Sequence, residues 1–242
     1  MSEPIRPPGL FVTGTDTGVG KTHVASLIAR ELSSGGMRVG VYKPVCSGAI
    51  LDEKGRARWD DIDRLRDAVR SNWSDSELTD DAICPQRFVA PLAPPLAARV
   101  EGRCVDVEQL RRGADWWTGR AELLIVEGAG GLLSPVSEAH DVADLARDIG
   151  YPLIVVARCG LGTINHSLLT VEAARRRDLP VVGVVLNQSC PEDNLALATD
   201  NAAEIEARSG VPVFGVVAWQ SPAGLQRDGQ TVTIRWHVLA GR

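Results

Sequence analysis

The feature that most constrains the fold is the run Thr13-Gly-Thr-Asp-Thr-Gly-Val-Gly-Lys-Thr22, which follows a short apolar segment at residues 10–12. Its glycines let consecutive backbone N–H groups turn toward a phosphate, and a helix that begins after the loop adds partial positive charge. Gly14 and Gly20 enclose five residues, one more than the strict spacing of such loops. The intact Gly-Lys-Thr end still predicts a nucleotide site, with Lys21 on the β- and γ-phosphates and Thr22 facing Mg²⁺. A glycine-rich turn without a ligand is the alternative.

Short β-branched runs alternate with amphipathic segments along the rest of the chain. We expect strands at 10–12, 39–42, 123–126, 153–156, 181–186 and 213–217, and helices at 23–32, 61–69, 142–149, 167–176 and 195–207. Apolar strands between helices are typical of a mainly parallel sheet covered on both faces. The sequence therefore predicts an α/β fold, a three-layer architecture like that of P-loop NTPases.

The whole chain, residues 1–242, is expected to form one domain, because no internal repeat or low-complexity linker divides it. Residues 87–95, rich in alanine and proline, are expected to be a surface loop of that domain. The tail at 221–242 is the least defined region, and 231–236 is a candidate edge strand within it.

Composition excludes several classes of function. A net charge of -5 gives no clustered basic face for nucleic acid. No aliphatic stretch approaches the ~18 residues needed to cross a bilayer, and the N-terminus lacks the apolar core of a secretory signal. The five cysteines include no Cys-x-x-Cys pair, which suits a reducing cytoplasm better than a disulfide framework.

The lysines mark a second cluster, Tyr42-Lys-Pro-Val-Cys-Ser-Gly48. Of 26 basic residues only Lys21, Lys43 and Lys54 are lysine, so a lysine within a motif is informative. Ligands of open α/β sheets collect at the carboxyl ends of the strands, where Lys43 and Ser47 would face the same crevice as the phosphate loop. The alternative is a solvated lysine before a turn.

A third cluster, Leu123-Leu-Ile-Val-Glu-Gly-Ala-Gly-Gly131, ends an apolar strand on Glu127, an arrangement like the Walker B carboxylate that holds Mg²⁺. A second carboxylate ligand is expected among Asp60, Asp61 and Asp63. These acids also suit a first helical turn, with Asp60 or Asp61 as N-cap, and local sequence does not choose among the three.

Two further strand ends carry polar groups. Residues 160–166 form a glycine-rich turn whose N–H groups suit a carboxylate, and Asn187 ends a strand where an amide can read a base edge. The four histidines have no metal-ligand spacing, so we interpret them as structural or surface residues.

Taken together, these motifs resemble the ATP-dependent dethiobiotin synthetase family of biotin biosynthesis. The resemblance rests on 13–22, 42–48, 126–131 and 161–170, and it spans roughly residues 9–219. It implies a cytoplasmic homodimer, a ligase that uses ATP, CO₂ or bicarbonate and 7,8-diaminononanoate. A carbamate would be phosphorylated to a carbamoyl-phosphate mixed anhydride and then closed into the ureido ring.

The resemblance also implies roles for individual residues. Lys43 and Lys21 look like the catalytic cations, and the Mg²⁺ set looks like Thr22, Asp61 and Glu127. Implied substrate contacts are Thr17, Ser47, Gly131, Leu161 and Asn165, with the 160–165 turn holding the substrate carboxylate across the dimer interface. Implied nucleotide contacts are Gly18, Val19, Gly20, Lys21, Thr22, His23, Asp61, Glu127, Gly128, Ala129, Gly130, Asn187, Gln188, Ala218, Trp219 and Gln220. Asn187 looks like the adenine contact.

Other classes of protein share part of this pattern. A partitioning-type switch ATPase has a similar fold but carries a lysine early in the loop, where this chain has Asp16. A cobyrinate-type amide ligase needs a glutaminase domain, for which 242 residues leave no room. A related ligase that keeps the scaffold but takes a different diamine substrate is a further alternative.

Overall fold

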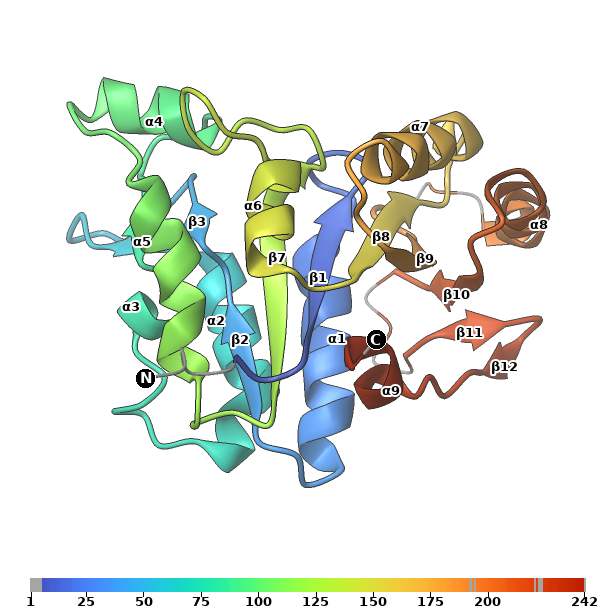
Figure 1. Cartoon of the computed structure of the whole chain (residues 1–242), viewed down its shortest axis with the longest axis horizontal. Helices are drawn as coiled ribbons and strands as arrows, with labels where there is room; N and C mark the ends of the chain where they lie inside the picture. The colour runs from blue at the N-terminus through green and yellow to red at the C-terminus, as the bar shows by residue number, and fades with distance from the viewer. Residues whose placement is uncertain (1–5, 192, 194, 220, 222–223, 242) are drawn as a thin grey trace.

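A computed structural model describes residues 6–191, 193, 195–219, 221 and 224–241. Its main sheet has the strand order β12-β11-β10-β9-β8-β1-β7-β2, in which the strands from β10 to β2 are parallel and β11 and β12 are antiparallel additions (Figure 1). The strands of this sheet are β1 Gly9–Gly14, β2 Val39–Tyr42, β7 Leu123–Gly131, β8 Leu153–Arg158, β9 Val181–Asn187, β10 Val213–Val217, β11 Gln226–Arg227 and β12 Gln230–Thr231.

Two small strand pairs lie outside this sheet, β3 (Val45–Cys46) with β6 (Gln86–Arg87), and β4 (Ile50–Leu51) with β5 (Ala57–Arg58). The α-helices are α1 Lys21–Ser34, α2 Asp60–Val69, α3 Asp80–Ile83, α4 Pro94–Val100, α5 Val107–Arg112, α6 Val142–Ile149, α7 Thr163–Arg175, α8 Ala198–Ser209 and α9 Trp236–Ala240. Short 3₁₀ turns follow α2 and α5 and precede α8.

The strand order explains how helices cover both faces of the sheet. The connection from β1 to β2 runs one way along the sheet, and those from β7 to β8, β9 and β10 run the other way. Because parallel crossovers are right-handed, α1 lies on one face and α6, α7 and α8 on the opposite face. Figure 1 shows α1 behind β1 and β7, with α6 in front of them. The sheet is therefore the middle of three layers, as predicted.

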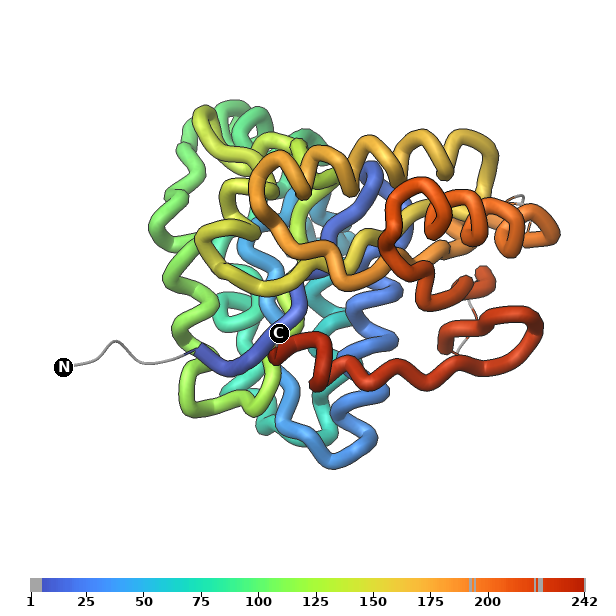
Figure 2. Tube along the Cα trace, turned by 45° about the vertical axis from the view of Figure 1, so that its right-hand side comes forward, coloured from blue at the N-terminus to red at the C-terminus, as the bar shows by residue number. Residues whose placement is uncertain are grey.

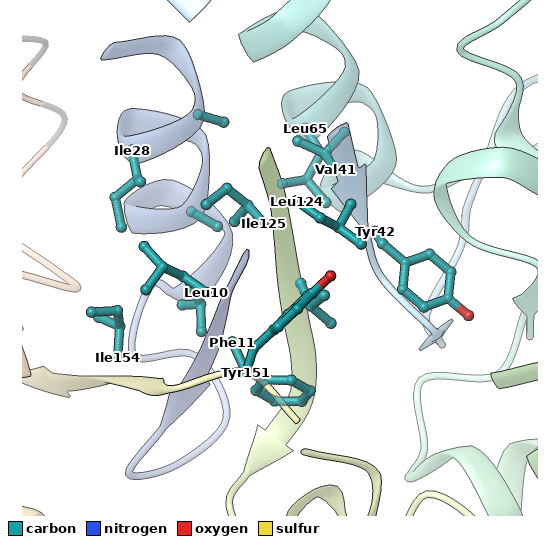
Figure 3. Packing of buried hydrophobic residues seen from close by; sticks show 14 of the residues in the cluster. Leu10, Phe11, Ile28, Val41, Tyr42, Leu65, Leu124, Ile125, Tyr151 and Ile154 are labelled. Carbon is teal, nitrogen blue, oxygen red and sulfur yellow. The ribbon is translucent and has the colours of Figure 1, made fainter. Parts of the chain in front are cut away.

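The core lies between the sheet and these helices. Figure 3 shows Ile28 of α1 and Leu65 of α2 turned toward the strand residues Leu10 and Ile125, and all four side chains are buried. At ~25 cal/mol per Å² of apolar surface, such fully buried side chains stabilise the fold by about 1.5–3 kcal/mol each. This packing fixes the carboxyl ends of β1, β2 and β7 relative to one another, and the site forms there.

The C-terminal tail differs from its expected structure. Of the edge strand expected at 231–236, only Thr231 pairs, as the last residue of β12 in a hairpin with β11, and Trp236 begins helix α9. The Trp236 ring meets Phe214 of β10 edge-on and its Nε1 donates to Glu31 of α1 at 2.9 Å, contacts that hold α9 against β10 and α1. Figure 2 shows α9 beside the chain that leads into β1.

Two other details of the fold differ from expectation. The expected loop at 87–95 contains the end of β6 and the first two residues of α4, where Pro94 and Pro95 occupy the first turn. Proline is tolerated there because its missing N–H would have no helical partner. Within the described residues, no helix is long and apolar enough to cross a membrane.

Candidate active site

The phosphate loop joins β1 to α1. Gly18 and Gly20 have φ values of +76° and +91°, a left-handed conformation that glycine adopts without strain, and Gly20 is the N-cap of α1. No side chain caps this helix, so its first N–H groups remain available to a ligand. Lys21 is buried, and its Nζ donates to the carbonyl oxygen of Asp16 at 2.9 Å across the loop. The backbone therefore has the form of an anion cradle.

Four side chains meet at the mouth of this loop, one each from α1, the end of β2, α2 and β7. Nζ of Lys43 lies 2.6 Å from Oε1 of Glu127 and 2.8 Å from Oδ2 of Asp61. Oγ1 of Thr22 lies 2.8 Å from Oδ1 of Asp61 and from Oε1 of Glu127. Lys43 is 4% and Glu127 1% exposed, so Lys43 is not the solvated lysine of the alternative interpretation.

The charged groups in this cluster shift one another's pKa values. Burial alone would lower the pKa of Lys43, but the Glu127 and Asp61 carboxylates outweigh it and hold that pKa above its usual range. Burial lowers the pKa of Lys21 to about 8, against the attraction of Glu127 and with repulsion from Lys43. Burial raises the pKa of Glu127, although Lys43 opposes this. Lys43 is thus a permanent cation at neutral pH.

The structure separates the three candidate aspartates. α2 begins at Asp60 with Trp59 as N-cap, so neither Asp60 nor Asp61 caps the helix. Oδ1 of Asp60 accepts from Arg58 at 2.8 Å, and Asp63 pairs with Arg58 and Arg66. Only Asp61, among the three, reaches Thr22 and Lys43.

The oxygen donors of this cluster suit a divalent cation. Thr22, Asp61 and Glu127 offer one hydroxyl and two carboxylates, the hard oxygen ligands that Mg²⁺ takes beside phosphates and water. Oε2 of Glu127 is buried without a hydrogen-bond partner, an orphaned acceptor that a cation would satisfy. The residues present therefore fit the metal that the loop requires.

A cavity of about 430 Å³ opens over the cluster. Most residues expected at the triphosphate line it. Cys46, Asp60 and Arg64 line it as well, and of these three the sequence predicts a role in ligand binding only for Asp60. Arg64 could have been found, since it follows Asp61 by three positions and shares its helix face. The lining residues are Thr17, Gly18, Gly20, Lys21, Thr22, His23, Lys43, Cys46, Ser47, Asp60, Asp61, Arg64, Glu127, Ala129 and Gly130.

A second cavity of about 430 Å³ adjoins the first, and Thr17, Ser47 and Gly130 line both. Oγ of Ser47 donates to the carbonyl oxygen of Leu92 at 2.6 Å, which ties the strand end to the segment before α4. The remaining wall is largely alanine, proline and leucine, including Pro91. An apolar pocket beside a cationic cavity suits a ligand with a polar end and an aliphatic chain.

The expected base contacts gather at the end of β9, outside the first cavity. Nδ2 of Asn187 donates to the carbonyl oxygen of Val19 at 3.0 Å, and Oδ1 of Asn187 is buried without a partner. Oε1 of Gln188 accepts from the backbone N–H of Trp219 at 2.8 Å. Trp219 is exposed and Ala218 half-buried, whereas Gln220 lies outside the described residues. Asn187 thus borders the phosphate loop, and Gln188 ties the end of β9 to the segment after β10.

The remaining predicted residues lie elsewhere. Gly128 is a packing position, because a Cβ there would lie 2.8 Å from Cγ1 of Val142. Gly131 lines a third cavity, of about 520 Å³, together with Asp16 and residues of α7. Leu161 is 93% exposed and Asn165 is exposed in the first turn of α7; neither lines the two cavities above.

Comparison with known proteins agrees with this architecture. A family described as an AAA domain matches residues 8–226. The ATP-dependent dethiobiotin synthetase BioD of Anaeromyxobacter dehalogenans is 45% identical over 212 residues, 88% of this chain and 90% of that protein. The proteins of the same name from Bacillus licheniformis and Thermodesulfovibrio yellowstonii are 40% identical (86% of this chain, 84% of that protein) and 36% identical (96% and 97%).

Solved structures share the fold at low identity. The 54 kDa signal recognition particle protein of Aeropyrum pernix is similar with a TM-score of 0.56 and 17% identity, over 94% of this chain but 45% of that one. A ParA family ATPase from Chlorobium tepidum has a TM-score of 0.51 and 18% identity, over 88% and 86% of the two chains. The fold is that of the P-loop NTPases. With identities of 36–45% over most of its length, the chain belongs to the family of the ATP-dependent dethiobiotin synthetases, which are ligases of biotin biosynthesis.

Proposed function

We propose that this enzyme forms the ureido ring of dethiobiotin from 7,8-diaminononanoate, CO₂ and ATP. The observation that carries the proposal is the buried Lys43 ammonium, held by Glu127 and Asp61 beside Lys21 at the mouth of the phosphate loop. A carbamate and a triphosphate are both anionic, and they repel each other as they approach. Two ammonium groups in a cavity of low dielectric offset that repulsion where the reacting oxygen meets the γ-phosphorus.

The reaction has three steps. An amine nitrogen of the substrate adds to CO₂ and loses a proton, which leaves a carbamate. A carbamate oxygen attacks the γ-phosphorus of ATP and ADP departs, so that a carbamoyl-phosphate mixed anhydride forms. The second amine then attacks the carbonyl carbon, releases phosphate and loses a proton as the five-membered urea closes.

The chain's own residues bind and orient in these steps. Because the carboxylates raise its pKa, Lys43 remains an ammonium and acts as an electrostatic clamp on the carbamate and the transferred phosphoryl group, not as a base. Lys21 and the N–H groups of the loop would hold the β- and γ-phosphates. Thr22, Asp61 and Glu127 would hold Mg²⁺, which supplies charge neutralisation to the phosphates when bound.

The second cavity is our proposed diamine site. Thr17, Ser47 and Gly130 connect it to the phosphate cavity, so a substrate amine there would face Lys43. Gly131, Leu161 and Asn165 would complete the site from a second copy of the chain, with the α7 turn on the substrate carboxylate. The exposure of Leu161 and Leu169, 93% and 60%, supports a surface that a homodimer covers.

We also propose that the nucleotide base lies against Asn187, whose buried Oδ1 is free to accept a hydrogen bond. A cytoplasmic enzyme is consistent with the cysteines, since all five are described and none forms a disulfide.

The test is a reconstitution assay. Purified protein with Mg²⁺, ATP, bicarbonate and 7,8-diaminononanoate should release dethiobiotin and ADP in equal amounts, measured by mass spectrometry. Lys43→Ala and Lys43→Met should lose turnover by roughly 10³-fold while still binding ADP, because one clamp on the transition state is gone. Lys54→Ala, at an exposed lysine of the β4–β5 turn, is the matched control.

Two results would contradict the proposal. ATP hydrolysis that proceeds equally well without any diamine would favour a switch ATPase of the partitioning type. Turnover with other diamines but not with 7,8-diaminononanoate would favour a ligase with a changed substrate.

A further inference from the structure

A recess between α1 and α2 lies beside the phosphate cavity and serves no role in the mechanism above. Its volume is about 220 Å³, and His23, Ser26, Arg30, Arg64 and Asp67 line it. His23 and Arg64 also line the cavity of Lys21 and Thr22, so the two spaces share a wall. A ligand at the phosphate loop therefore passes close to the recess.

The recess holds polar groups that the fold leaves unpaired. Within the described residues, neither Arg30 nor Arg64 makes an ion pair or side-chain hydrogen bond, although most arginines of this chain do. Oγ of Ser26, a residue 5% exposed, and Nε2 of His23 are buried without a partner. Arg30 and Arg64 are exposed, but the Ser26 hydroxyl and the His23 ring nitrogen are expensive to bury unless a ligand satisfies them.

The charges indicate the kind of ligand. His23, Arg30 and Arg64 line the same recess, and burial, followed by the charges of Arg64 and Arg30, lowers the pKa of His23. Asp67 is the one carboxylate in the lining, which leaves the recess with an excess of positive charge. Guanidinium forks and a hydroxyl donor match the oxygens of a phosphate group.

We propose that this recess is a second phosphate-binding site, in which Arg64 and Arg30 hold a phosphate group from the side opposite the loop. The proposal rests on the proposed function for the identity of the nucleotide. The phosphate has two possible sources, the nucleotide phosphate nearest the nucleoside and free inorganic phosphate. The shared wall favours the nucleotide, and Ser221, two positions after Trp219 in the sequence, lines the recess as well.

The experiment compares single and double variants in binding assays that need no turnover. Arg64→Gln, Arg30→Gln and their combination are titrated by calorimetry with ADP, AMP, adenosine and, separately, inorganic phosphate. Arg208→Gln/Arg235→Gln is the matched control, because it removes the same charge from exposed positions on α8 and before α9. Thermal melts verify that every variant is folded.

We expect the double variant to lose roughly tenfold or more in affinity for ADP and AMP, the effect of losing hydrogen bonds to a charged group, while adenosine binds as before. Loss of phosphate binding alone would also support the site and identify free phosphate as its occupant. Unchanged affinities for all phosphates, or an equal loss for adenosine, would overturn it. These outcomes do not depend on dethiobiotin formation, so the recess and the proposed function can fail separately.

Discussion

Gly130 stands between the phosphate cavity and the proposed diamine cavity. Its φ is +74°, and a Cβ there would overlap Oγ of Ser134 and lie 3.4 Å from Oγ1 of Thr17. A side chain at this position would narrow the passage between the two cavities.

Gly130→Ala should therefore raise the KM for the diamine at least tenfold while ADP affinity changes little. The left-handed backbone adds a stability cost of about 1–2 kcal/mol. Gly150→Ala separates the two effects, since Gly150 has φ +81° at the end of α6 and open space around its Cβ. Steady-state kinetics and thermal melts on both variants check this. Equal KM values for the diamine in the two variants would show that Gly130 does not control the passage between the two cavities.

At the residue scale, a sequence motif indicates which segment contributes to the site, but not which of its side chains faces the ligand. Asp60, Asp61 and Asp63 look alike in sequence, and only the position of α2 against α1 turns Asp61 toward Thr22. Local sequence also gives no reason to expect Arg30 and Arg64 to face one recess, because they come from different helices.

At the scale of elements, the regular strands and helices were predictable from periodicity. The bounds expected for β2, β10 and α6 agree with the structure, because apolar patterning and punctuation coincide there. α3, α4 and α5 have at most seven residues, too short for a pattern to emerge. Tertiary contacts, not local propensity, determine whether such short segments form helices.

An ion pair adds to the pairing of β11 with β10 that joins the β11–β12 hairpin to the sheet. Glu206 of α8 accepts from Arg227 at 2.9 and 3.1 Å and from the N–H of Val213 at 2.8 Å. Burial opposes the shift, but these hydrogen bonds and the Arg227 charge lower the pKa of Glu206.

A carboxyl group whose pKa is lower in the folded protein stabilises the fold at pH values above its pKa in the unfolded chain. That stabilisation is lost as the pH falls through the pKa of the folded protein. We expect the β11 amides to lose protection against hydrogen exchange, relative to the intrinsic rate at each pH, below about pH 4.5, the usual pKa of a glutamate. Glu206→Gln should show the faster exchange already at pH 7, with a loss of about 0.5–1 kcal/mol.

Glu204→Gln, which removes a solvent-facing pair with Arg208 on the same helix, serves as the control. The same exchange in wild type and Glu206→Gln at pH 7 would show that the pair does not anchor the hairpin.

At the scale of the whole molecule, the proposed homodimer would cover one end of α7. Leu133 and Leu169 line the cavity that also contains Gly131, and both are exposed. Leu161 precedes the same helix. Exposed leucines grouped beside a cavity are typical of a surface that a partner buries.

Leu169→Glu should convert a dimer into a monomer in light scattering, because a carboxylate would be buried without a partner. The variant should keep ADP affinity and lose diamine turnover, since the phosphate loop is complete in one chain. Val238→Glu is the control, because it places the same charge at an exposed position on α9, which lies away from α7 (Figure 1). A monomeric wild type, or a Leu169→Glu dimer with normal turnover, would contradict the expectation.

The contact between Asn187 and the phosphate loop has a wider consequence. Asn187 donates to the carbonyl oxygen of Val19, and a Cβ at Gly20 would overlap its amide nitrogen. The amide that we propose contacts the base and the turn that forms the phosphate loop are thus in direct contact. A designer who swaps position 187 to change nucleotide preference would also loosen the triphosphate grip, so selectivity and affinity cannot be tuned independently here.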